Sequence, residues 1–80
     1  MKQLAKESTM KAAEVLSVAE SFFGPEGLGL TVADHADGCV TFEGGGGFVR
    51  VSASAKAGGS AVNVDTSEWE QPALRFLTRV

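Results

Sequence analysis

The sequence predicts an α+β domain: a two-layer sandwich in which two helices cover one face of a four-stranded antiparallel meander, in the order α-β-β-β-β-α. Two observations predict this fold. Near both ends of the chain, apolar residues recur every three or four positions, as in helices buried along one side. Between these ends they alternate with polar or small residues, as in strands buried on one face. With 80 residues, the chain is expected to form a single domain, residues 1–80.

The first helix is expected from about Thr9 to Phe23, and Ser8 or Thr9 can cap its start. Its apolar stripe consists of Ala12, Val15, Leu16, Ala19, Phe22 and Phe23. Gly24 is expected to end the helix in the left-handed conformation that glycine tolerates. Three interpretations of residues 1–7 remain open: a frayed lead-in, an extension of the helix, or a short edge strand.

The second helix is expected from about Ser67 to the C-terminus. Ser67 and Glu70 have the spacing of a capping box. Its apolar stripe consists of Trp69, Ala73, Phe76, Leu77 and Val80. Trp69 is expected to anchor this helix to the sheet, because a large aromatic side chain buries much apolar surface.

Four strands are expected between the helices, near residues 28–33, 39–43, 49–55 and 61–65. A three-residue loop at 36–38, a glycine-rich loop at 44–47 and a two-residue turn at Gly58-Gly59 are expected to join them. The expected cross-strand pairs are His35 with Cys39, Val32 with Phe42, Phe42 with Val49, Cys39 with Ser52, Ala53 with Val64, and Ser52 with Asp65.

These registers agree on which side chains share a face of the sheet. The inner face, which both helices must cover, is expected to hold Leu30, Val32, Val40, Phe42, Val49, Val51, Ala53, Ala55, Val62 and Val64. No element is left to cover the outer face. Its side chains are mostly small and uncharged: Thr31, Ala33, His35, Cys39, Thr41, Glu43, Phe48, Arg50, Ser52, Ser54, Asn63 and Asp65.

The sequence contains only weak candidates for a catalytic or metal-binding site. A cross-strand pair of His35 and Cys39 would allow an imidazole to activate a thiol. Asp65 would lie two strands away, however, and could not orient that imidazole as in a triad. Asp34, His35 and Asp37 lack the ligand number and spacing of a calcium or zinc site and suit a polar turn instead. We therefore expect no catalytic residue, metal or cofactor.

The run Gly44–Gly47 does not match a phosphate-binding loop, because it precedes a strand and lacks the Lys and Ser or Thr of that motif. Two interpretations stay open. The run forms a flexible hairpin loop, or it allows the backbone to approach a partner closely.

The composition argues against several classes of function. A net charge of −3 is opposite in sign to that of most nucleic-acid-binding domains. No apolar run is long enough for a membrane span, and charged residues interrupt every candidate signal segment. The single Cys fits a reducing compartment, so we expect a cytoplasmic protein that binds neither nucleic acid nor membrane.

From about Val40 onward, the chain resembles the C-terminal part of helix-grip domains, the START and polyketide-cyclase-like class. The resemblance rests on the glycine-turned strands Gly44–Val51 and Ala61–Thr66, followed by the amphipathic segment Trp69 to Val80. It implies a helix lying on an antiparallel sheet, and binding of an apolar ligand. It supplies no catalytic residue.

We expect the chain to be a small non-enzymatic interaction module that forms a homodimer through its open sheet face or an edge strand. The expected interface residues are Thr41, Phe48, Arg50, Ser52 and Asn63. The alternative is a module that binds a small apolar ligand between helices and sheet. The small side chains that leave room there are Ala12, Ala19, Ala53 and Ala55.

Overall fold

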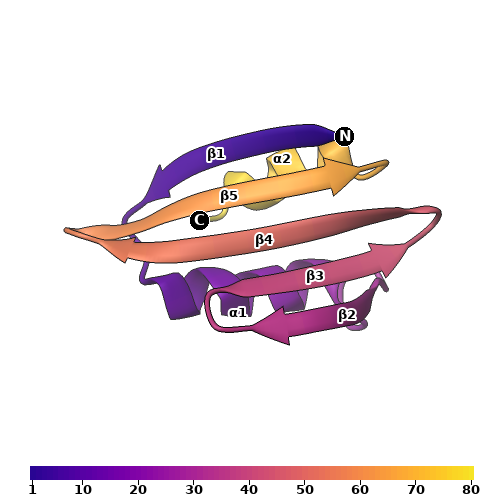
Figure 1. The fold of residues 1–80 in the computed structure, drawn as a ribbon, viewed down its shortest axis with the longest axis horizontal. Coiled ribbons are helices and arrows are strands. Elements are labelled where there is room, and N and C mark those ends of the chain that lie inside the picture. Colours follow the sequence, from indigo (N-terminus) through magenta and orange to yellow (C-terminus); the bar gives the residue numbers. More distant parts are fainter.

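The computed structural model describes residues 1–80, which form five strands and two helices (Figure 1). In chain order these are β1 (Lys2–Ser8), α1 (Ala12–Phe23), β2 (Thr31–Ala36), β3 (Cys39–Gly44), β4 (Gly47–Lys56), β5 (Gly59–Ser67) and α2 (Glu70–Leu77). The strands form one antiparallel sheet in the order β1-β5-β4-β3-β2. The α+β class is therefore confirmed. The expected number of four strands is wrong, because the N-terminal segment supplies a fifth.

Strand β1 shows that the edge-strand interpretation of residues 1–7 is the correct one. It pairs with β5 along its whole length, with Leu4 opposite Val64. Leu4 is half-buried beside the core, whereas Gln3 and Ala5 are exposed. The Nζ atom of Lys6 donates a hydrogen bond to the carbonyl oxygen of Leu77, at 2.6 Å. That contact attaches the strand to the end of α2, which otherwise leaves carbonyl groups unpaired.

Both helices lie behind the sheet in Figure 1, so the other face of the sheet is uncovered. Helix α1 contacts β3, β4 and β5, and α2 contacts β5 and β1. The space between helices and sheet is filled by Val15, Ala19, Phe23, Leu30, Val40, Phe42, Val49, Val51, Ala53, Val62, Val64, Ala73, Phe76 and Leu77. Of the side chains expected on the inner face, Val32 on the edge strand β2 and Ala55 near the end of β4 are exposed.

The core contains a cluster of aromatic rings. The ring of Phe23 lies 5.0 Å from that of Phe22, 5.5 Å from that of Phe42 and 5.3 Å from that of Phe76, measured between centroids. These tilted and edge-on contacts are favourable arrangements for aromatic pairs. The cluster joins both helices to β3.

Helix α1 begins and ends differently from the expectation. It starts at Ala12 rather than Thr9, because the Ser8 hydroxyl accepts a hydrogen bond from the Met10 amide and donates one to the Val80 carbonyl oxygen. Gly24 ends the helix with φ −69°, which is not left-handed, and its amide bonds to Glu20. A Cβ atom at Gly24 would overlap the Glu20 carbonyl oxygen, so glycine is required there by space rather than by φ.

Helix α2 begins later than expected. It runs from Glu70 to Leu77, and no side chain caps its start, whereas at its end the Thr78 Oγ1 atom donates a hydrogen bond to the carbonyl oxygen of Arg75, at 2.6 Å. Ser67 belongs to β5, so the predicted capping box with Glu70 does not form. Glu68, between strand and helix, has a φ of +74°, which turns the chain sharply toward the inner side of the sheet.

The hairpin between β2 and β3 differs from its predicted register at one end. Val32 opposes Phe42 as expected, but a bulge follows and Ala36 rather than His35 opposes Cys39. The predicted three-residue loop at 36–38 is instead a turn at residues 37–38, in which Gly38 has the expected left-handed φ of +74°. A bulge inserts one residue, so His35 moves to the other face of the sheet.

The hairpin between β4 and β5 turns one residue earlier than expected. Ala53 opposes Val62 instead of Val64, and Ser52 opposes Asn63 instead of Asp65. The turn lies at residues 57–58, and Gly59 already belongs to β5. Glycine is needed at position 59 for a different reason than the turn. A Cβ atom there would overlap the carbonyl oxygen of Ser8, where β1 ends. The register shift is two residues, so every side chain keeps its predicted face.

The run Gly44–Gly47 forms a tight turn rather than a flexible loop. Gly45 and Gly46, with φ of +58° and +80°, make the two-residue connection, and the predicted pairs Phe42–Val49 and Cys39–Ser52 are confirmed. Positive φ at both central positions is the pattern of the tight hairpin turns that match the twist of a sheet. Neither of the two helices is long and apolar enough to cross a membrane.

Candidate functional site: the outer face of the sheet

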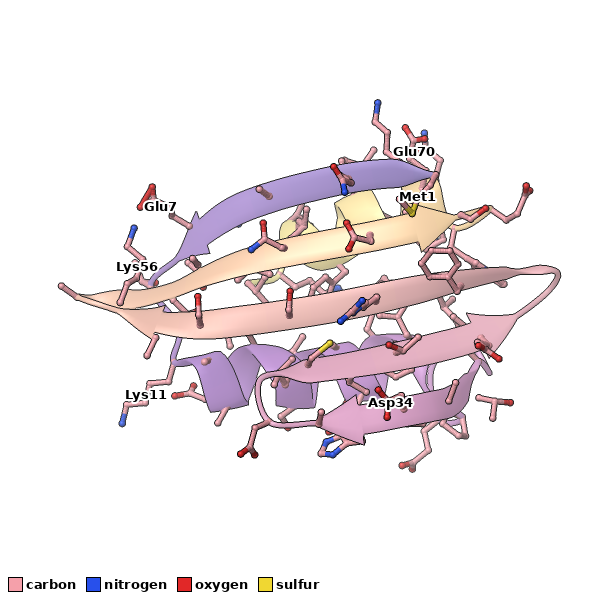
Figure 2. The ribbon with its side chains drawn as sticks, in the orientation of Figure 1. Met1, Glu7, Lys11, Asp34, Lys56 and Glu70 are labelled. Carbon is pink, nitrogen blue, oxygen red and sulfur yellow. The ribbon has the colours of Figure 1, made fainter.

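The outer face of the sheet is built from cross-strand rows of side chains, seen from the front in Figure 2. We call three of them the small row, the charged row and the end row. The small row contains Ala5, Asn63, Ser52, Cys39 and Ala36. The charged row contains Gln3, Asp65, Arg50, Thr41 and Asp34. The end row, beside the glycine turn, contains Ser67, Phe48, Glu43 and Thr31.

Arg50 lies at the centre of the charged row on β4, the middle strand of the sheet. Its Nε atom donates a hydrogen bond to the Cys39 Sγ atom, at 3.3 Å. The hydrogen bond to Cys39 raises the pKa of Arg50, and the nearby carboxylates of Asp65 and Asp34 act in the same direction. The guanidinium is exposed and takes part in no ion pair within the chain.

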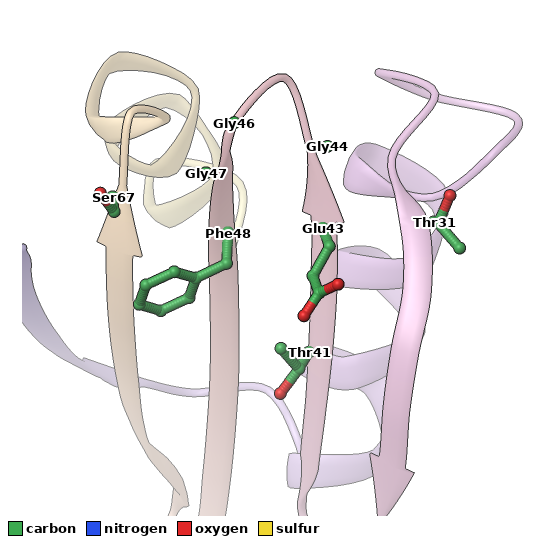
Figure 3. Close-up of a pocket in the computed structure, with 8 residues that line it drawn as sticks. All are labelled: Thr31, Thr41, Glu43, Gly44, Gly46, Gly47, Phe48 and Ser67. Carbon is green, nitrogen blue, oxygen red and sulfur yellow. The ribbon is translucent and has the colours of Figure 1, made fainter.

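Beside Arg50, the outer face has a shallow hollow next to the glycine turn, wide open to solvent (Figure 3). The hollow has a volume of about 840 Å³ and is lined by Thr31, Thr41, Glu43, Gly44, Gly46, Gly47, Phe48 and Ser67. In Figure 3 the Phe48 ring extends from β4 toward Ser67 on β5, away from Glu43, which projects with Thr41 from β3. The side chains around the opening are therefore one aromatic ring, one carboxylate and three hydroxyl groups.

Phe48 is the one phenylalanine that lies outside the aromatic cluster. The other four make ring contacts behind the sheet, whereas Phe48 opposes Glu43 on the outer face and is half-buried. A half-buried aromatic ring on an uncovered face offers apolar area for a contact.

All five residues that the sequence predicts for an interface lie on the outer face. Phe48 belongs to the end row, Arg50 and Thr41 to the charged row, and Ser52 and Asn63 to the small row. The prediction did not include Glu43 and Ser67, which line the hollow with Phe48. Glu43 directly opposes Phe48 across the glycine turn, so the alternation of the two strands that flank the glycine run is the signal that could have found it. Ser67 opposes Phe48 from the end of β5, where the sequence analysis expected the start of a helix.

The predicted row His35–Cys39–Ser52–Asp65 does not form. His35 faces the helix side, where its Nε2 atom lies 3.9 Å from the Glu20 Oε1 atom, and Asp65 opposes Arg50. The neighbour of Cys39 is therefore a guanidinium and not an imidazole. Asp34 and His35 point to opposite faces, and no three potential metal ligands of the chain gather in one place.

No protein-family model matches the chain, and comparisons with curated proteins and with solved structures find no match. Function is therefore inferred from the geometry of the outer face.

Proposed function

We propose that this chain is a small two-layer interaction domain whose outer sheet face packs against the same face of a second copy. The observation that carries the proposal is the small row. It crosses all five strands without a charged or long side chain, from Ala5 on β1 to Ala36 on β2. A row of small side chains lets a second sheet approach closely, since stacked sheets lie only about 10 Å apart.

The size of the outer face suits a specific dimer. Five strands spaced about 4.8 Å apart make a sheet roughly 24 Å wide. The five strands hold 38 residues, so their mean length at about 3.3 Å per residue is roughly 25 Å. The face therefore offers roughly 600 Å², which is at the low end of the area that each partner buries in a specific interface. The proposed role is binding and not catalysis, because no base faces Cys39.

Sedimentation equilibrium over a range of concentrations tests the proposal. The unmodified chain is expected to dimerise, and Ser52→Arg is expected to be monomeric, because a long charged side chain in the small row keeps the two sheets apart. Ser17→Arg is the matched control, since Ser17 is exposed on α1, on the opposite side of the domain. It should dimerise like the unmodified chain. A monomer at every concentration, or a Ser52→Arg variant that still dimerises, would contradict the proposal.

A second candidate function is the binding of a small apolar ligand, as the helix-grip resemblance implies. Ala19 and Ala53 are buried in the packed core, so they leave no open room between helices and sheet. The favourable observation is instead a hollow of about 320 Å³ between α1 and β2, with Ala12 and Leu16 in its wall. An apolar fluorescent dye is expected to bind there, and Ala13→Trp, at the rim, should abolish its signal. Equal dye binding by the unmodified chain and by the Ala13→Trp variant would argue against this site.

A further inference from the structure

We infer that Arg50 of each copy inserts into the hollow of the other copy, where its guanidinium pairs with Glu43 beside the Phe48 ring. This inference rests on the proposed face-to-face dimer and names the contact that specifies it. The hollow is then a binding site for a cationic group, and the second copy supplies that group.

The chemistry of the hollow suits a guanidinium. Phe48 and Glu43 are directly opposed on β4 and β3 and both line the hollow; the ring lies on the β5 side of β4 and the carboxylate on the β3 side, so a group seated over β4 has one on either side (Figure 3). A guanidinium can stack against an aromatic ring and donate two parallel hydrogen bonds to a carboxylate. Glu43 makes no hydrogen bond or ion pair within its own chain, so its oxygens are free to accept. The hydroxyl groups of Thr41 and Ser67 at the rim add further acceptors.

Arg50 is the cation that the outer face can supply. The other cation on that face, Lys56, is paired with Glu7 at the far end of β4 and β1. Arg50 uses only its Nε atom within the chain, so its two terminal nitrogens remain free to donate to a partner. In a dry interface such a group must find a counter-charge, since burying an unpaired charge is costly.

The arrangement is self-complementary. Arg50 follows Phe48 by two residues on β4, which places them roughly 7 Å apart on the same face. A two-fold axis that passes between Arg50 and the hollow brings each Arg50 over the other copy's Phe48 and Glu43 simultaneously. This reciprocity is the property of an interface between two identical surfaces. Asp65 and Asp34, in the same row as Arg50, compensate part of the positive charge of the two guanidinium groups that the interface contains.

A charge-swap experiment tests the contact. Arg50→Glu sets a new carboxylate against the Glu43 carboxylate of the other copy, and Glu43→Arg sets a new guanidinium against the Arg50 guanidinium of the other copy. Each variant therefore repels itself and is expected to dimerise at least about tenfold more weakly than the unmodified chain. An equimolar mixture should recover a heterodimer, because the two native groups then face each other across one contact and the two introduced groups across the other. Arg75→Glu, an equal charge change at an exposed position of α2, is the control and should leave dimerisation unchanged.

The possible results separate the two proposals. Sedimentation of the separate and mixed variants, with thermal unfolding to establish that each is folded, gives the readout. If the unmodified chain dimerises but folded Arg50→Glu and Glu43→Arg also dimerise normally, the Arg50 contact is wrong and the face-to-face dimer stands. If both variants are monomeric and their mixture does not associate, the contact is also wrong. If the unmodified chain is monomeric at all concentrations, both proposals fail.

Discussion

The indole Nε1 atom of Trp69 donates a hydrogen bond to the carbonyl oxygen of Gly44, at 2.9 Å. These residues lie 25 positions apart and connect the start of α2 to the turn between β3 and β4. A Cβ atom at Gly45 would lie only 2.9 Å from the Trp69 ring, so the glycine turn fits against the indole. The close backbone approach that the glycine run permits is therefore to the chain's own tryptophan.

Replacing Trp69 with Phe is expected to destabilise the fold by about 1–3 kcal/mol, because the Gly44 carbonyl loses its donor and the ring that covers the turn shrinks. Urea unfolding followed by circular dichroism measures this change. Leu74→Ala, at an exposed position of the same helix, should change the free energy of unfolding by no more than about 0.5 kcal/mol. Equal stability of the Trp69 variant and the unmodified chain would show that the hydrogen bond contributes nothing.

Phe23 and Phe48 are expected to respond differently to truncation. Phe23→Ala removes the centre of the aromatic cluster and should cost about 3–5 kcal/mol of stability, a large part of what so small a domain has. Phe48→Ala should have a smaller effect on unfolding but weaken dimerisation. Thermal unfolding and sedimentation of both variants measure the two effects. The reverse ranking would contradict the placement of the two rings.

Gly59→Ala is expected to loosen β1 from the sheet, because the added methyl group overlaps the Ser8 carbonyl oxygen and the backbone has to move. We expect a loss of roughly 2 kcal/mol or more, with faster amide hydrogen exchange in β1 than in β3. Gly46→Ala is the control, since Gly46 also has a positive φ but nothing lies within 4 Å of an added Cβ atom. If both variants lose the same stability, backbone strain alone accounts for the effect.

The ion pair between Glu7 and Lys56 is expected to give a small pH dependence of stability. The hydrogen bond and positive charge of Lys56 lower the pKa of Glu7 below its ordinary value of 4.5. A lowered pKa in the folded state stabilises the fold above that ordinary value, and the contribution disappears as the pH falls through the lowered pKa. The effect is small because both groups are exposed and screened by salt.

An NMR titration of the Glu7 carboxyl group checks this expectation. In Lys56→Met the pKa should return toward 4.5, and added salt should shift it the same way in the unmodified chain. A Glu7 pKa that is equal in the two proteins would show that the pair does not form in solution.

The faces of the strands could be predicted from the sequence because side chains alternate with a period of two. The β4–β5 turn lies one residue earlier than predicted, yet Val62 and Val64 are still buried, since moving a turn by one residue shifts the register by two. For the same reason the five predicted interface residues share the outer face. The alternation carried this prediction even where the turn was placed wrongly.

Two features had no usable signal in the sequence. Strand β1 reads as a mixture of charged and apolar residues, and its partner β5 lies at the other end of the chain, so local patterns do not reveal the pairing. The bulge between Val32 and Asp34 has no glycine to mark it. It moves His35, the predicted neighbour of Cys39, away from the outer face. Arg50 takes that place because it lies diagonally across from Cys39 on the adjacent strand.

The pairing of β1 with β5 also determines when this chain can finish folding. Lys2 opposes Thr66, 64 positions further on, whereas β2 to β5 are joined by tight turns and can assemble locally. Contacts so distant in sequence form late, because the entropy of closing the intervening loop must be overcome first. During synthesis β1 therefore leaves the ribosome well before its partner exists. Its charged residues, Lys2, Lys6 and Glu7, would hinder it from pairing with other nascent chains in that interval.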